Sequence, residues 1–185
     1  IPKNEGEIMN IENISIVNYK NINEAEVEFS QKLNCFIGRN GAGKTNMLDA
    51  VYYLSFCKSF FNSVDQLNIN HDENFFMLNG HYKRNDSEEK ISVGLKRAQK
   101  KQVKRNTKVY KKLQEHIGLL PLVMITPSDG NLILGGSDER RKFMDGVISQ
   151  YNQNYLDDLL KYNRALLQRN NLLKQFAGEK YFDAE

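Results

Sequence analysis

The chain has 185 residues, 40% of them hydrophobic, with 26 basic and 23 acidic side chains and a net charge of +3. This length fits one domain, or one and a fraction, with enough apolar residues for a core. No run approaches the roughly 18 apolar residues that cross a membrane, so we expect no membrane association and no signal peptide. Cys35 and Cys57 are expected to be buried and reduced, which favours a cytoplasmic protein.

The chain opens with a predicted pair of antiparallel strands. Residues 1–8 are mostly polar and precede Met9, so we assign them to an upstream extension. Residues 10–19 and 24–29 read as strands, because the second alternates apolar and acidic side chains. Tyr19-Lys20-Asn21 forms a turn with a basic tip between them.

The apolar run 33–37 predicts a third strand, and a helix is expected from Lys44 to about residue 58. A glycine-rich segment lies between them. Its residues are Gly38, Arg39, Asn40, Gly41, Ala42, Gly43, Lys44 and Thr45. This spelling between a strand and a helix predicts a P-loop, whose backbone amides cradle phosphates at the helix N-terminus. Lys44 is expected to reach the β- and γ-phosphates and Thr45 to ligate Mg²⁺. The sequence therefore predicts binding of a nucleoside triphosphate with Mg²⁺.

The helix after the P-loop is expected to cover a sheet. The side chains predicted to face that sheet are Met47, Leu48, Val51, Tyr52 and Leu54. Residues 75–82 and 90–95 read as further strands joined by a turn at 84–87, and 102–110 as a hairpin. The apolar run 119–125 contains Pro121, so we predict a strand only from Leu122 onward.

Residues 96–112, called the basic block below, hold nine Lys or Arg side chains and no acid. Such a block is usually the solvated face of an edge hairpin, but it also attracts polyanions. Both interpretations stay open from sequence alone. For the second, we select Lys101, Lys104 and Arg105 as candidates for DNA contact.

The last third of the chain predicts helices. Asp138 and Glu139 suit a helix N-terminus, and that helix is expected to run to about residue 151. Arg140 and Arg141 oppose the dipole there, so we add them as DNA-binding candidates. A long helix is predicted from 155 to 176. Leucine and asparagine line one face of it at three- to four-residue spacing, which is typical of a coiled-coil seam that needs a partner helix.

Together these motifs resemble the RecF family of SMC- and ATP-binding-cassette-type ATPases. The resemblance covers Met9 to about residue 175 and rests on the 19–21 turn, the P-loop with Asn46, and three later segments. Those segments are Ile125-Thr126-Pro127, Leu134-Gly135-Gly136-Ser137 with Arg140-Arg141, and Gln168-Arg169-Asn170. Lys20 stands where the family usually has arginine, and Phe61 where it often does.

The resemblance implies an α/β fold: the N-terminal half of a cassette-type P-loop ATPase head, with antiparallel first strands and a helical arm. Residues 9–135 would form this half, lobe I, and 136–185 the start of the arm, lobe II, which is truncated. It also adds Lys20 and Asn46 to the expected ATP contacts. The half that carries the signature and Walker B motifs is expected elsewhere, so we predict no catalytic residue in this chain and no hydrolysis by it alone.

The family further implies a DNA repair and replication protein of the SOS response to DNA damage. Such a protein binds duplex DNA near single-strand gaps in an ATP-switched manner and dimerises with ATP. With RecO and RecR it helps place the recombinase RecA. A cassette-headed nuclease of the OLD type or another SMC-like head is the alternative. A small-molecule P-loop kinase is less favoured, because kinases usually carry the P-loop after their first strand.

Overall fold

The computed structural model describes residues 9–84 and 87–179. The chain divides into two compact units, one ending at Met124 and the other beginning at Ile125. The division into lobes after residue 135 remains a prediction about the complete protein.

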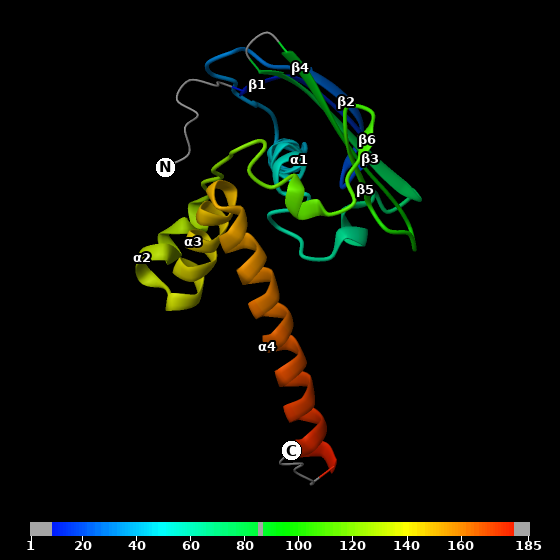
Figure 1. Ribbon diagram of the computed structural model, residues 1–185. Helices are drawn as coiled ribbons and strands as arrows, with labels where there is room; N and C mark the ends of the chain where they lie inside the picture. Colours follow the sequence, from blue (N-terminus) through cyan, green and yellow to red (C-terminus); the bar gives the residue numbers. More distant parts are fainter. Residues whose placement is uncertain (1–8, 85–86, 180–185) are drawn as a thin grey trace. The chain divides into compact units, whose positions relative to one another are not determined.

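The first unit is built on a six-stranded antiparallel sheet in the order β2-β1-β3-β4-β5-β6 (Figure 1). Its strands are β1 (Met9–Tyr19), β2 (Ile22–Glu28), β3 (Phe75–Arg84), β4 (Ser87–Lys96), β5 (Gln102–Arg105) and β6 (Lys108–Val109). The strands predicted at 10–19, 24–29, 75–82 and 90–95 and the hairpin at 102–110 are confirmed. Of the predicted turn at 84–87, residues 85 and 86 lie outside the described part of the chain.

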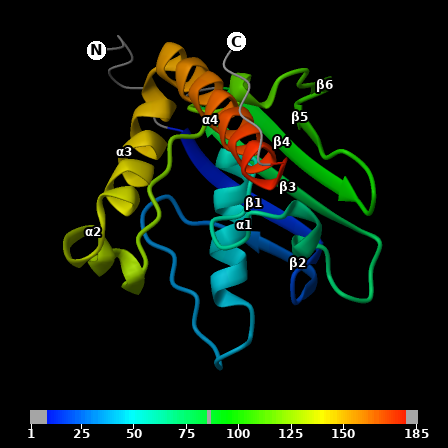
Figure 2. The ribbon, with the colours of Figure 1, turned by 90° about the horizontal axis from the view of Figure 1, so that it is seen from below.

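Helix α1 (Lys44–Phe56) packs against one face of this sheet, and Figures 1 and 2 both show it lying across the strands. The core between them is fully buried at Ile14, Ile16, Leu54 and Leu78. Gly80 of β3 lies under the Leu54 side chain of α1. A Cβ there would stand 2.6 Å from the ring of the buried Tyr82 and 2.8 Å from a methyl group of Leu54, so only glycine fits without a shift.

The buried face of α1 differs from the prediction. Met47, Asp49, Ala50, Tyr53 and Leu54 are buried, whereas Leu48 is 48% exposed. The prediction chose the most apolar stripe, but the true face is rotated by about one residue, or 100° of helix. It is rotated because Asp49 lies inside, where four donors satisfy its carboxylate.

Two predicted strands are wrong. Residues 33–37 and 122–125 run as irregular chain, with Leu33, Ile37 and Ile125 at 78%, 94% and 82% exposure. Neither segment has a ladder partner among the described residues, and a strand without a partner leaves its backbone groups unpaired. At 30–34, hydrogen bonds between Ser30 and Asn34 hold a local turn instead. Cys35 is therefore exposed, not buried as expected, whereas Cys57 is buried.

Short 3-10 turns connect these elements: η1 (Asp65–Asn68), η2 (Leu113–Glu115) and η3 (Pro127–Gly130). The second unit contains α2 (Asn131–Leu134), α3 (Ser137–Tyr151) and α4 (Gln153–Glu179). The two long helices predicted there are confirmed. Leu156 of the predicted seam is buried, whereas Leu166 and Leu173 are exposed. No helix in the described ranges is long and apolar enough to span a bilayer.

Candidate nucleotide-binding site

The P-loop, residues 38–45, joins the irregular segment after β2 to α1. Gly41 and Gly43 adopt φ angles of 82° and 98°, a left-handed region that strongly favours glycine. Gly43 is also the N-cap of α1. Glycine is needed at 43 for space as well, because a Cβ would lie 3.1 Å from Oδ1 of Asn21. The two left-handed glycines thus let the loop turn directly into the N-terminal end of α1.

Lys44 is placed by its own loop. Its ammonium donates to the carbonyl oxygens of Gly38 and Arg39 at 2.8 and 2.9 Å. A lysine ammonium has three donor hydrogens, so one remains for a ligand when two serve the loop. The positive charge is therefore fixed at the N-terminal end of α1, where the helix dipole also favours an anion.

The start of α1 fits a triphosphate. In the described structure, no side chain caps Gly43 and the first turn carries no acid, so its backbone N–H groups are left to an anionic ligand. Thr45 is exposed in that first turn, and its hydroxyl is the donor type that P-loops use for Mg²⁺. Residues 38–46 lie together at the start of α1, and they could hold the phosphates with their metal ion.

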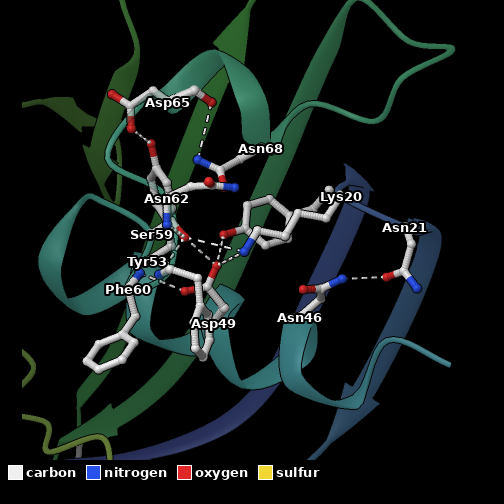
Figure 3. A network of polar contacts seen from close by, with 12 residues as sticks. Lys20, Asn21, Asn46, Asp49, Tyr53, Ser59, Phe60, Asn62, Asp65 and Asn68 are labelled. Atoms are coloured by element: carbon white, nitrogen blue, oxygen red, sulfur yellow. Dashed lines mark hydrogen bonds and ion pairs between the residues drawn. The ribbon is translucent and has the colours of Figure 1, made fainter. Parts of the chain in front are cut away.

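The turn between β1 and β2 contacts this loop from the side. The Asn21 side chain donates to the carbonyl oxygen of Gly41 at 2.7 Å and accepts a hydrogen bond from the Asn46 amide at 2.7 Å. Figure 3 shows the Asn21–Asn46 pair beside the first turn of α1. Asn21 was not selected from the sequence, although it lies within the predicted turn.

A buried carboxylate organises the other side of the same turn (Figure 3). Asp49 is 0% exposed and accepts hydrogen bonds from the Tyr19 hydroxyl at 2.6 Å, the Ser59 hydroxyl at 2.7 Å and the Phe60 backbone N–H at 2.7 Å. The Lys20 ammonium completes the set with an ion pair at 2.5 Å. These contacts join β1, α1 and the segment after α1 at one point.

Lys20 is bound tightly to this centre. Its ammonium also donates to Ser59 at 3.3 Å and lies 5.5 Å from the centre of the Phe61 ring. Its backbone is left-handed, with φ of 52°, which costs about 1–3 kcal/mol for a residue other than glycine. The two positions that differ from the family pattern, Lys20 and Phe61, therefore meet each other. A direct contact between Lys20 and nucleotide remains a prediction.

The tyrosines around Asp49 stay protonated. Burial, followed by the negative charge of Asp49, raises the pKa of Tyr19 far above its ordinary value. Burial and the hydrogen bond to Asp65 do the same for the pKa of Tyr53. Both hydroxyls are therefore permanent donors to a carboxylate.

The C-terminal end of α1 is closed by side chains from distant segments. The Leu54 carbonyl lies 2.6 Å from Nε2 of the buried His116, and the Ser55 hydroxyl donates to the Leu120 carbonyl at 2.5 Å. Lys101 donates to the Cys57 carbonyl and forms an ion pair with Asp65 at 2.8 Å. Because helix C-termini favour cations, Lys101 also complements the dipole.

With this geometry in view, the similarity to known proteins decides the family. A family model described as an AAA ATPase domain matches residues 9–177. The chain belongs to the AAA ATPase domain family. A DNA replication and repair protein RecF from Phocaeicola vulgatus is 59% identical over 96% of this chain and 47% of its own length.

Solved structures of RecF proteins are also similar to this chain. Two of the recombination mediator protein RecF, described as RecF-ATPrS and RecF-ATP in the RecFOR pathway, match with TM-scores of 0.86 and 0.81. They are 34% and 35% identical, over 94% of this chain and 47% and 48% of theirs. An SMC ATPase at 15% identity and a TM-score of 0.61 shares the fold over 74% of this chain and 98% of its own. The resemblance to RecF and the α/β head fold are thereby confirmed, and the chain spans about half the length of these RecF relatives.

The five DNA-binding candidates differ in how far their charges are already paired within the protein. Arg105 is held by an ion pair with the buried Glu89, and Lys101 by Asp65, so the charges of both are compensated inside the protein. Lys104 is exposed on β5. In α3, Arg141 pairs with Asp138, and Arg140 donates to the Gly135 carbonyl at 3.1 Å.

Sequence reasoning missed the polar residues that hold the AAA ATPase domain's P-loop helix in place. Asp49 was passed over because it interrupts an apolar stretch, yet an acid inside a predicted core helix is itself a signal of a buried polar centre. His116 showed no metal-ligand spacing and was given no role, and its single use is structural. Ser59 had no pattern that could have identified it.

Proposed function

We propose that this chain is the ATP-binding part of a RecF-like DNA repair and replication protein. The observation that carries the proposal is the P-loop, where Gly41, Gly43 and Lys44 present amides and a fixed ammonium at an uncapped helix start. The backbone N–H groups of the first turn and Lys44 would bind the phosphates, and Thr45 would bind Mg²⁺. The RecF-ATP structures support ATP as the nucleotide.

Calorimetry of Mg-ATP binding to the full-length protein tests this assignment. Lys44→Ala should lower the affinity at least about a hundredfold, near 2.7 kcal/mol, because it removes a charge-assisted phosphate contact. Lys58→Ala is the matched control, since Lys58 is exposed just beyond α1. Equal affinities for the two variants would overturn the proposal.

For the complete protein we extend the proposal to DNA. It binds double-stranded DNA at single-strand gaps in an ATP-switched manner, as an ATP-dependent homodimer in the cytoplasm, and acts with RecO and RecR to load recombinase. The relatives' names, DNA replication and repair protein and recombination mediator protein of the RecFOR pathway, support this role. Sedimentation with and without ATP tests the dimer, and recombinase loading on gapped duplex tests the partners.

Six lysines of the basic block are exposed, among them Lys96, Lys111 and Lys112. From the six we select the other three, Lys100, Lys104 and Lys108, as phosphate contacts. All three are exposed, and none forms an ion pair with any residue in the described ranges. Changing them to Gln should flatten the plot of log affinity against log salt by about 0.9 per lost contact. An unchanged slope, with a flatter one for Arg140→Gln/Arg141→Gln, would move the DNA contact to α3.

A further inference from the structure

The peptide between Gly41 and Ala42 is held at both of its ends. Its carbonyl accepts the Asn21 hydrogen bond at 2.7 Å, and its N–H donates to the Arg39 carbonyl at 3.2 Å. Because a peptide is planar, two opposed hydrogen bonds determine which way its dipole points. In a loop that is to receive phosphates, a carbonyl turned toward the ligand would repel it. The Asn21 bond keeps this carbonyl occupied by the protein.

Asn21 itself is held by its neighbour in the turn and by Asn46. Its neighbour Lys20 is locked to the buried Asp49 by the ion pair at 2.5 Å. Its own Oδ1 accepts from Asn46, the residue directly after Thr45. The same oxygen lies 3.1 Å from the position of a Cβ on Gly43. Consecutive residues of one hairpin turn thus hold the P-loop and the first two turns of α1 in register.

We propose that Asn21 is a positioning residue for the nucleotide site. Its side chain bridges the P-loop and α1, and it orders the loop before ligand arrives without contacting the phosphates. This inference rests on the proposed nucleotide function of the loop. It assigns the β1–β2 turn a role in triphosphate affinity that is separate from any contact between Lys20 and nucleotide. Preorganised donors bind more tightly because the loop loses less freedom on binding.

The chain supplies a matched control in the same hairpin. Asn23 accepts a hydrogen bond from the Asn70 amide, also at 2.7 Å, but in the described structure neither side chain forms a hydrogen bond with the P-loop. Asn23→Ala therefore removes an equivalent bond without affecting the loop. Asn21→Asp is a second variant of unchanged size, which keeps the acceptor for Asn46 and loses the donor to Gly41.

The experiment measures Mg-ATP and AMP affinity and the urea midpoint of the nucleotide-free full-length protein for each variant. Asn21→Ala should weaken Mg-ATP about three- to tenfold, the range expected for one net hydrogen bond, and Asn21→Asp at least as much. Asn23→Ala should bind Mg-ATP like the parent and shift the urea midpoint in the same direction as Asn21→Ala but by less, because it removes one hydrogen bond where Asn21→Ala removes two. AMP affinity should change less than Mg-ATP affinity, because AMP lacks the β- and γ-phosphates that Lys44 is expected to reach.

Two results separate this inference from the function on which it rests. If Lys44→Ala weakens Mg-ATP but Asn21→Ala and Asn21→Asp match Asn23→Ala, Asn21 has no positioning role and the inference is wrong. If Lys44→Ala binds Mg-ATP like the parent, the nucleotide function itself is wrong. A further arm places Asn21→Ala in the Lys44→Ala background. No additional loss there would support action through the loop, and a full additional loss would contradict it.

Discussion

At its N-terminal end α1 begins with two left-handed glycines, no capping side chain in the described structure and an exposed Thr45. At its C-terminal end the carbonyls of Tyr53, Leu54 and Cys57 are each occupied, by the Cys57 N–H, by His116 and by Lys101. The first end leaves its unpaired backbone groups to a ligand, and the second uses protein donors for them. One helix therefore combines a receptive end with a closed end.

The difference between the two ends shows which part of α1 is held rigidly by the protein. The closed end is buried at Leu54, Ser55 and Cys57, and the segment around His116 is anchored on it. Asp49 lies between the two ends and joins α1 to β1. The far end and the middle of α1 are thus fixed by buried contacts, whereas the loop at its start is held by the exposed hydrogen bonds of Lys44 and Asn21.

The largest expected effect that tests this contrast is the difference between the alkylation rates of the two cysteines. Burial raises the pKa of Cys57 to about 12, whereas Cys35, before the P-loop, is exposed. Only a thiolate alkylates quickly, so Cys57 should react at least about a thousandfold more slowly than Cys35. Peptide mass spectrometry after iodoacetamide should find Cys35 but not Cys57 modified in the folded protein, and both modified in urea. Equal rates without urea would show that this end of α1 is open.

Removing Asp49 should cause the next largest change. Asp49→Ala leaves Lys20 without its partner inside the protein, and breaking a buried pair in this way costs about 3–5 kcal/mol of unfolding free energy. Urea unfolding measures the loss. Asp49→Asn, which keeps the shape and several acceptor bonds, should lose less. If both variants unfold at the parent's urea concentration, the Asp49 centre does not stabilise the fold.

Comparing Lys101 with its neighbour Lys100 tests which charges of the basic block stabilise the fold and which are only solvated. Lys101→Met loses the ion pair with Asp65 and the bond to the Cys57 carbonyl, and should cost about 1–2 kcal/mol. Lys100→Met, one residue earlier and exposed, should change the urea midpoint little. DNA affinity should show the reverse order. Equal destabilisation by the two substitutions would remove the distinction between these neighbours.

His116 should produce the smallest effect, and only at low pH. Burial, and next the charge of Arg105, outweigh its bond to Leu54 and lower the pKa of His116 below its ordinary value. The unfolded chain then binds the proton more readily, so unfolding free energy is retained above about pH 6.5 and falls as the pH drops below it. His116→Gln should flatten that fall in urea titrations between pH 5 and 8. A parent-like slope in the variant would assign the pH dependence to other groups.

Local pattern predicted the elements whose partners lie nearby in the described chain. β3 and β4 were found because each carries its own alternation and pairs with its neighbour, and α3 and α4 because helices satisfy their own backbone. Residues 33–37 have an equally apolar pattern, yet Ile37 is exposed and no strand pairs with them in the described ranges. A strand needs a ladder partner, which the pattern of a single segment cannot reveal.

The residues of the candidate site also divide into those that the sequence could predict and those that it could not. The P-loop was predictable because backbone conformation and phosphate chemistry require particular residues at fixed spacing. The supporting centre of Tyr19, Asp49 and Ser59 was not, because its members are 10 to 40 residues apart and each is an ordinary residue type. Their roles arise only when the β1–β2 turn and the segment after α1 converge on one carboxylate.

Gly80 is a position where one substitution would lower the stability of the fold and make the amount of folded protein depend on temperature. A methyl group there would meet the Tyr82 ring and a methyl group of Leu54, so Gly80→Ala forces these side chains to shift at a position outside the P-loop. Overpacking of this kind commonly costs about 1–3 kcal/mol, a large share of a domain's total stability. A cell carrying that allele would keep the protein at low temperature and lose it on warming. The position is therefore suited to a temperature-sensitive mutant that removes the protein on demand while leaving its site chemistry intact.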